Sequence, residues 1–185
     1  MRPNSAPRLV PAGYQIGAPR AYELAELPAI EVEAAALFPR EDLAPEMREE
    51  GLPLSFFEEV ASAGRLWVAR TVEPPVPVGF AAVVLLDGSG HLHEMDVHPA
   101  HGRRGLGRAL VLHAAEWART SGFAYLTLTT FRHLPWNGPF YSGAGFAEIP
   151  ARELGPELRA AMAEEAAQGL DPRKRVAMRL DLRAT

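Results

Sequence analysis

Hydrophobic residues recur along the chain with two different periods, which divide it into strands and helices. Segments rich in β-branched and aromatic residues predict strands. We expect strands at residues 14–16, 65–71, 78–87, 91–97, 124–131 and 175–182, and a further strand that begins at Phe146. Only short turns separate the second, third and fourth of these segments, which predicts an antiparallel meander.

Apolar residues at helical spacing predict the helices of the chain. We expect them at residues 21–38, 55–64, 105–121, 140–144 and 155–171. Pro28 interrupts the first helix near its start, and the polar, proline-containing stretch 41–53 predicts a loop with room for a helical turn. Ser55 and Glu58 have the spacing of a capping box, and Gly64 is a residue type that ends helices.

The order of these elements predicts an α/β fold. A helix connects strands 91–97 and 124–131, and such a crossover makes the two strands parallel neighbours. The other connections favour antiparallel pairing, so we expect a mixed, mostly antiparallel sheet flanked by helices. Residues 14–183 form one predicted domain without repeats or linkers, and the proline-containing residues 1–13 form a flexible leader.

Composition and charge narrow the classes of function. A chain of 185 residues is long enough for one core, and a net charge of −4 argues against general nucleic-acid binding. No apolar run reaches the length of about 20 residues that spans a bilayer, and the leader lacks the apolar stretch of a signal peptide. We therefore expect a cytoplasmic protein without a membrane partner. The chain has no cysteine, which excludes disulfides, thiolate metal sites and a cysteine acyl-enzyme.

The segment HPAHGRRGLGRAL, residues 98–110, combines glycine and arginine at the predicted start of a helix. Glycine lets the backbone approach a ligand closely, and arginine prefers an anion. The first turn of a helix also offers free N–H groups and the positive end of the helix dipole. The segment therefore predicts a diphosphate site made of Gly102, Arg103, Arg104, Gly105, Leu106, Gly107 and Arg108.

Other interpretations of this segment fit the residues less well or are less specific. A P-loop needs Lys-Ser/Thr after its last glycine, where this chain has Arg108 and Ala109. A dinucleotide fingerprint needs a third glycine at the position of Leu110. The plainest alternative is a strand-to-helix turn with solvated arginines, and the glycines alone do not decide against it.

A wider pattern is more specific than the glycines. VHPAHGRRGLGRAL follows a predicted strand, and FYSGAGF follows some thirty residues later, at 140–146. The combination resembles the GNAT superfamily of acetyl-CoA-dependent N-acyltransferases over most of residues 65–150. The residues that match its motifs are Val97, Pro99, Gly105, Gly107, Tyr141, Gly145 and Phe146.

The resemblance implies where acetyl-CoA would bind. In that family two parallel strands splay apart, and the pantetheine arm lies between them like an additional strand. Carried over to this chain, the cofactor-binding positions are Met95, Asp96, Val97, the seven residues from Gly102 to Arg108, Asn137 and Tyr141. The usual Arg/Gln position of the motif is Gly102 here, which leaves open which arginine touches phosphate.

Transfer of an acetyl group to an amine needs two proton transfers. A primary amine is mostly protonated at neutral pH, so a base must accept its proton, and the leaving thiolate benefits from a proton donor. The resemblance assigns the donor role to Tyr141; the alternative is an aromatic residue that only packs beside Phe140. No covalent intermediate is required, which fits a chain without cysteine.

The base is either His93 or Glu94. Strict alternation along strand 91–97 would place His91, His93, Met95 and Val97 on one face and Leu92, Glu94 and Asp96 on the other. An imidazole is a plausible base near neutral pH, and many family members carry glutamate at the position of His93. Glu94 is the second candidate because its face points away from that of His93.

The remaining expectations concern metals and partners. His98 and His101 lie near the His-x-His pair, but no motif fixes a third ligand, so we expect no metal. The predicted acceptor is a small-molecule or peptide amine, bounded by residues 38–55 and 132–139, and strand 175–182 could join a homodimer. Two other functions stay open, namely an acyl-CoA-binding sensor without catalysis and a binder of another nucleotide.

Overall fold

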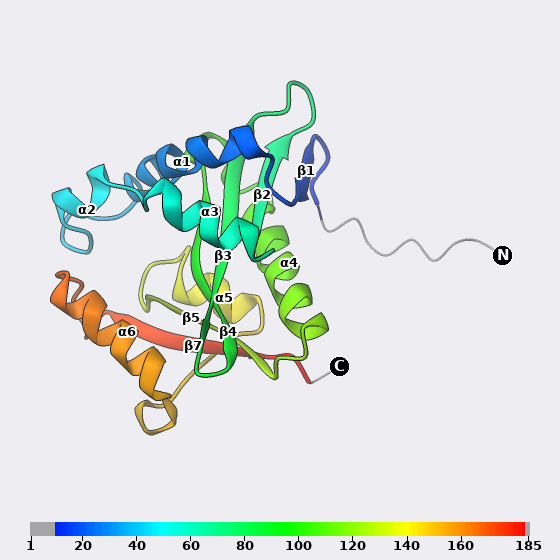
Figure 1. Ribbon diagram of the computed structural model, residues 1–185. Coiled ribbons are helices and arrows are strands. Elements are labelled where there is room, and N and C mark those ends of the chain that lie inside the picture. Colours follow the sequence, from blue (N-terminus) through cyan, green and yellow to red (C-terminus); the bar gives the residue numbers. More distant parts are fainter. Residues whose placement is uncertain (1–9, 184–185) are drawn as a thin grey trace.

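The computed structural model describes residues 10–183, and its strands form one seven-stranded sheet (Figure 1). The strand order is β1-β2-β3-β4-β5-β7-β6. The strands are β1 (Tyr14–Gly17), β2 (Leu66–Thr71), β3 (Pro77–Leu86), β4 (Ser89–Val97), β5 (Tyr125–Phe131), β6 (Ala147–Glu148) and β7 (Arg175–Asp181). All neighbours are antiparallel except β4 and β5, which confirms the predicted meander and the predicted parallel pair.

Helices cover both faces of the sheet. The α-helices are α1 (Leu27–Ala35), α2 (Pro45–Glu49), α3 (Leu54–Ser62), α4 (Leu106–Thr120), α5 (Gly138–Gly143) and α6 (Pro156–Ala167). Short 3-10 helices are η1 (Ala21–Glu26), η2 (Pro99–His101) and η3 (Ala151–Glu153). Figure 1 shows α1 and α3 on one face and α4 on the other.

Two apolar clusters hold these layers together. Under α4, Leu110 and Ala114 pack with strand residues such as Leu128, and all three are buried. Under α1 and α3, Leu27 and Phe57 pack against the opposite face of β2 and β3. The helical spacing that predicted residues 105–121 is therefore the spacing of the buried side of α4.

Two details of the predicted helices are wrong. The segment 21–38 begins as the 3-10 helix η1 and becomes α-helical only at Leu27, because Pro28 lies in the first turn of α1 and has no N–H to continue an earlier helix. The helix expected to begin at Ser55 begins at Leu54 after Pro53, and no side chain caps it. The capping box therefore does not form.

Two further expectations concern the ends of the chain, namely the flexible leader at residues 1–13 and a homodimer through strand 175–182. The predicted leader lies outside the described residues up to residue 9, and residues 11–14 form a turn in which the Tyr14 N–H donates to Pro11. β7 lies between β5 and β6 in the sheet. The homodimer through this strand is not tested by this arrangement and stays a prediction. Among residues 10–183, none of the helices is both long and apolar enough to cross a membrane.

A buried ion pair connects η1 to β2. Nε of Arg70 donates to Glu23 Oε1 over 2.6 Å, and Nη2 donates to Oε2 over 2.8 Å. The Arg20 backbone N–H donates to the same carboxylate over 2.7 Å. The Glu23 side chain is 0% exposed and that of Arg70 is 6% exposed, so each charge depends on the other for compensation.

Replacement of Glu23 by alanine is expected to lower the free energy of unfolding by about 3–5 kcal/mol, because it leaves the Arg70 guanidinium buried without its counter-charge. Urea unfolding at neutral pH measures this change. Glu26 is exposed on the same 3-10 helix, and its replacement by alanine is expected to change stability by no more than about 0.5 kcal/mol. Equal losses in the two variants would contradict a structural role for the pair.

Candidate active site

The parallel pairing of β4 and β5 ends after two residue pairs. Gly90 pairs with Leu126 and His91 with Thr127, whereas β4 continues to Val97. Beyond these pairs, neither strand has its parallel neighbour for the backbone N–H and C=O groups on its facing edge. The predicted splayed pair is therefore present, and its open edges can pair with an extended ligand.

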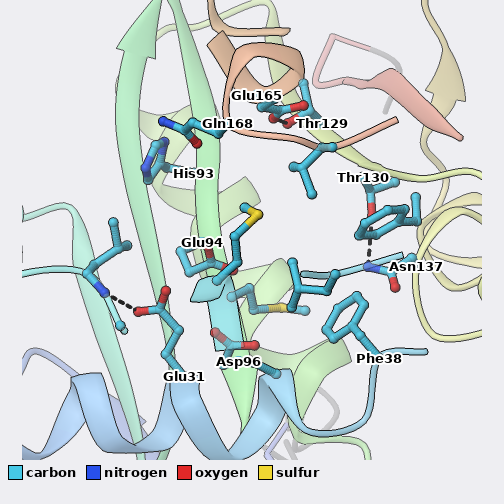
Figure 2. A pocket seen from close by; sticks show the side chains of 18 of the residues that line it. Glu31, Phe38, His93, Glu94, Asp96, Thr129, Thr130, Asn137, Glu165 and Gln168 are labelled. Atoms are coloured by element: carbon cyan, nitrogen blue, oxygen red, sulfur yellow. Dashed lines mark hydrogen bonds between the residues drawn. The ribbon is translucent and has the colours of Figure 1, made fainter. Parts of the chain in front are cut away.

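A cavity of about 800 Å³ lies beside the splayed strands. Its walls come from α1, β4, β5, α5, α6 and the segment around α2. Figure 2 shows side chains of these elements around it, among them Glu31, Glu94, Asp96 and Asn137. The cavity thus collects polar groups from segments far apart in the sequence.

A bulge in β4 decides which side chains reach this cavity. Ala82 of β3 pairs with Glu94, and the next residue, Val83, pairs with Leu92, so His93 is the extra residue. Cross-strand partners share a face of the sheet, and Ala82 and Val83 face opposite ways. Leu92 therefore lies in the core under α4, and Glu94 faces the side of α1.

The bulge corrects the expected alternation of β4. Strict alternation placed Glu94 and Asp96 on the face opposite His91, yet all three line the same cavity. Met95 and Val97 instead pack against the core under α4. The reason is physical: one extra residue in a strand with a period of two exchanges the faces of all residues that follow it.

Three carboxyl groups lie close enough in this cavity to influence one another. Desolvation raises the pKa of Glu94 to about 8, and the charge of Glu31 adds to the shift. Burial also raises the pKa of Asp96 well above its usual value, with Glu94 and Glu31 as further causes. Glu31 Oε2 accepts a hydrogen bond from the Leu52 N–H over 2.8 Å, while burial raises the pKa of Glu31. A cation near these groups would favour their ionised forms.

The two histidines of β4 have different environments. His91 is 3% exposed, its Nδ1 lies 2.9 Å from the Thr127 hydroxyl oxygen, and burial lowers its pKa to about 3. His93 is exposed on the bulge, and its ring lies 5.1 Å from that of Phe56. Desolvation at the cavity lowers the pKa of His93 as well, so both imidazoles are neutral at neutral pH.

Tyr141 and Asn137 approach the cavity from the segment that forms α5. Tyr141 is buried, and its ring packs against those of Phe140 at 5.0 Å and Phe146 at 5.6 Å. Burial raises the pKa of its hydroxyl, which therefore stays protonated at neutral pH. Asn137 Nδ2 donates to Thr130 Oγ1 over 2.9 Å, and its Oδ1 is buried with no hydrogen-bond partner among the described residues.

The glycine-rich segment forms a tight loop before α4. Gly105 precedes the helix with φ of +86°, and Arg103 has φ of +56°, so both residues adopt the left-handed conformation. A Cβ atom at Gly107 would lie 3.5 Å from the Phe140 ring and 3.7 Å from the Met95 methyl group. Glycine at this position therefore keeps the surface between α4, α5 and β4 open.

Two arginines of the glycine-rich segment, Arg104 in the loop and Arg108 in the first turn of α4, contact neighbouring protein groups. Arg104 Nη1 donates to the Tyr14 hydroxyl over 3.0 Å, and that hydroxyl lies 2.9 Å from His101 Nδ1. Arg108 Nη1 donates to the Gly143 carbonyl over 3.4 Å. Arg103 and Arg104 are exposed. The loop is thus attached to β1 through Tyr14, a contact that the motif did not predict.

The predicted site residues fall into two neighbouring groups. Those that line the cavity are His93, Glu94, Met95, Asp96, Asn137 and Tyr141. Val97 and the loop from Gly102 to Arg108 lie outside its lining, where β4 ends and α4 begins. Among residues 10–183, no three or more histidine, aspartate and glutamate side chains are placed to hold a metal ion.

Comparison with protein families shows which family has this combination of splayed strands and glycine-rich loop. A model of the acetyltransferase (GNAT) family matches residues 27–146. The chain belongs to this family. The matched part runs from α1 to the residue before β6 and includes the splayed strands, the glycine-rich loop and Tyr141. The resemblance noted in the sequence is confirmed.

Solved GNAT structures share the fold. The ribosomal-protein-S18-alanine N-acetyltransferase of Escherichia coli is 20% identical, with a TM-score of 0.63 and coverage of 91% of this chain and 94% of that one. PaiA N-acetyltransferase of Thermoplasma acidophilum, in complex with coenzyme A, is 15% identical, with a TM-score of 0.62 and coverage of 91% and 98%.

A third structure is the N-acetylglutamate synthase of Neisseria gonorrhoeae, complexed with coenzyme A and N-acetyl-glutamate. It is 18% identical with a TM-score of 0.66, and the match covers 94% of this chain and 36% of that one. At these identities the likeness establishes the GNAT fold of this chain, with its mixed sheet and parallel pair.

Several polar residues of the GNAT cavity were not found from the sequence. Glu31 belongs to α1, which comes long before β4 in the sequence, and helical spacing alone does not say that its side chain meets that strand. Thr130 and Glu165 also line the cavity. A weak signal existed for Thr130, because threonines interrupt the apolar residues of the strand predicted to be buried.

Proposed function

We propose that the protein transfers an acetyl group from acetyl-CoA to a primary amine, directly and within a ternary complex. The observation that supports this most is the continuity of three features. The glycine-rich start of α4, the open edges of β4 and β5, and the cavity with Glu94 and Tyr141 follow one another along β4.

We expect the substrate acetyl-CoA to make two kinds of contact with this chain. Backbone N–H groups from Gly102 to Gly107 would bind the pyrophosphate, favoured by the dipole of α4. The open edge of β4 at Met95–Val97 would pair with the amides of the pantetheine arm. The open surface at Gly107 fits such a ligand, because a side chain there would fill the space beside Phe140.

Glu94 is the proposed base. Its carboxylate would take a proton from the ammonium group of the acceptor, and the free amine nitrogen would then attack the carbonyl carbon of the thioester. A pKa of about 8 makes Glu94 a stronger base than an ordinary carboxylate while part of it is still ionised at neutral pH. His93 is the less favoured candidate, because its lowered pKa makes it a weaker base.

Tyr141 is the proposed acid. The C–S bond breaks as the amide forms, and the negative charge moves to the sulfur of coenzyme A. The raised pKa of Tyr141 keeps its hydroxyl protonated, so the phenol can stabilise that sulfur by donating a hydrogen bond or its proton. Asn137 Oδ1 lacks a partner among residues 10–183 and is available to an N–H donor of a bound substrate.

The direct test measures release of coenzyme A thiol from acetyl-CoA in the presence of a panel of primary amines. Amine-dependent release together with mass-spectrometric detection of the N-acetylated amine supports transfer. Binding of acetyl-CoA without release in the presence of any amine would favour the acyl-CoA-binding sensor. Thermal protection by ATP, but not by coenzyme A, would favour a binder of another nucleotide.

Replacement of Gly107 by glutamate is expected to weaken coenzyme A binding about 10- to 100-fold, since a carboxylate would meet the proposed pyrophosphate site. Calorimetric titration with coenzyme A measures the dissociation constant. Ser121→Glu is the matched control, because it adds the same charge at the far, exposed end of α4. Unchanged affinity in a folded Gly107→Glu protein would remove the loop from the proposal.

A further inference from the structure

The side chains that line the cavity are strongly acidic. Seven carboxylate residues belong to its lining, namely Glu31, Glu46, Glu50, Glu94, Asp96, Glu164 and Glu165. Arg175 is the only lysine or arginine among the described lining residues. The cavity therefore holds a large excess of carboxyl groups over cationic side chains, in a protein whose overall net charge is −4.

Arg175 does not compensate for this excess. Its Nε and Nη2 both donate to Glu165, each over 3.0 Å, and Nη2 also donates to Thr129 Oγ1 over 3.2 Å. The Arg175 guanidinium thus compensates the charge of one carboxylate, that of Glu165. Within the part of the chain that the structure describes, no salt bridge involves any of the other six.

The carboxylates come from elements on different sides of the cavity. Glu31 reaches it from α1, and Glu94 and Asp96 reach it from β4 (Figure 2). Figure 2 places Glu165 of α6, and Gln168 just after the end of that helix, away from Glu31 and Asp96. A ligand that fills the cavity would therefore meet carboxylates at more than one point along its length.

The geometry of two of these groups favours a cation as their partner. Asp96 Oδ2 is buried and has no hydrogen-bond donor among residues 10–183. Glu31 Oε2 is held by the Leu52 N–H, which orients the carboxylate while Oε1 makes no hydrogen bond with a described residue. Buried carboxylates without donors are costly, and an ammonium group supplies both N–H donors and the opposite charge.

We propose that the acceptor is a small amine with at least two ammonium groups. This inference rests on the proposed acetyl transfer. One ammonium group loses its proton to Glu94 and is acetylated, and the second binds the carboxylate of Glu31, with Asp96 beside it. Residues of α1, α2 and α6 line the site on different sides, so a small di- or polyamine can meet carboxylates on more than one wall.

Three amines of equal chain length test the proposal: 1,4-diaminobutane, butylamine and 4-aminobutanoate. They share the reacting amine and a chain of four carbon atoms. The fourth carbon carries an ammonium group in 1,4-diaminobutane, is a methyl group in butylamine and is the carboxylate carbon in 4-aminobutanoate. From the strength of charge-assisted hydrogen bonds, we expect kcat/KM for 1,4-diaminobutane to exceed that for butylamine about 10- to 100-fold. The value for 4-aminobutanoate is expected to be lowest, because its carboxylate is repelled.

Glu31→Gln removes the charge but keeps an oxygen that can accept the Leu52 hydrogen bond. We expect the kcat/KM ratio of 1,4-diaminobutane to butylamine to fall about tenfold or more in this variant, mainly through KM. Glu33→Gln is the matched control, because Glu33 is exposed on the same helix and does not line the cavity. Its ratio is expected to stay at the wild-type value.

The outcomes separate this inference from the proposed function. Equal kcat/KM values for 1,4-diaminobutane and butylamine, with coenzyme A thiol released from both, would overturn the diamine proposal and leave acetyl transfer intact. The same holds if Glu31→Gln lowers activity with both amines equally. If acetyl-CoA binds and none of the three amines releases thiol, acetyl transfer to such amines fails, and the diamine proposal fails with it.

Discussion

Replacement of Glu94 by glutamine is expected to lower kcat/KM for amine acetylation about 10²- to 10⁴-fold, the usual contribution of a general base. Glutamine has nearly the same volume and can still accept a hydrogen bond, but it cannot take a proton from an ammonium group. The β4 bulge turns Glu94 into the cavity beside Asp96, which is where the proposed base must lie.

The pH dependence provides a second measurement of the same role. A general base acts in its ionised form, and desolvation raises the pKa of Glu94 to about 8. The kcat/KM of the unmodified protein should therefore rise as the pH increases through about 8. It should fall at lower pH, where Glu94 becomes protonated. Glu94→Gln should lose this step and keep only the slower rise due to ionisation of the amine itself.

His93→Gln is the matched variant for this experiment. His93 occupies the bulge next to Glu94, so the substitution tests the other base that the sequence left open, at the same place in the strand. We expect a change in kcat/KM well below that of Glu94→Gln. A large loss in His93→Gln together with a small one in Glu94→Gln would assign the base to the histidine.

The glycine-rich loop and the fold could be predicted because their signals are local. Apolar spacing marks the buried side of α4, and glycine is required where the backbone takes a left-handed turn at Gly105. The parallel pair follows from the order of strand, helix and strand. Each inference depends on residues that are neighbours in the sequence, and the structure places them as expected.

The lining of the cavity could not be predicted because its determinants are not local. One extra residue at His93 moves both Glu94 and Asp96 to the face of the sheet opposite the one that strict alternation predicts. No residue type in HLHEMDV marks the bulge. Glu31 meets β4 only through the packing of α1 on the sheet. The place of Glu94 in the cavity, and the acidic character of the cavity, therefore depend on tertiary contacts that periodicity does not report.

Tyr141→Phe is expected to lower kcat about 10²- to 10³-fold while the dissociation constant of coenzyme A changes little. The substitution removes one oxygen atom and keeps the ring contacts with Phe140 and Phe146, so the packing of α5 should be unchanged. Steady-state kinetics measure kcat, calorimetric titration measures the dissociation constant of coenzyme A, and the unfolding temperature reports whether the packing of α5 is unchanged.

The same measurements separate a proton donor from a packing residue. A donor acts only when the thiolate leaves, so its loss lowers kcat without weakening the bound ground state. Tyr22→Phe controls for the loss of a tyrosine hydroxyl, because Tyr22 is 58% exposed on η1 and does not line the cavity. If Tyr141→Phe lowers kcat, coenzyme A affinity and unfolding temperature together, Tyr141 shapes the site by packing, and the thiolate must obtain its proton from solvent.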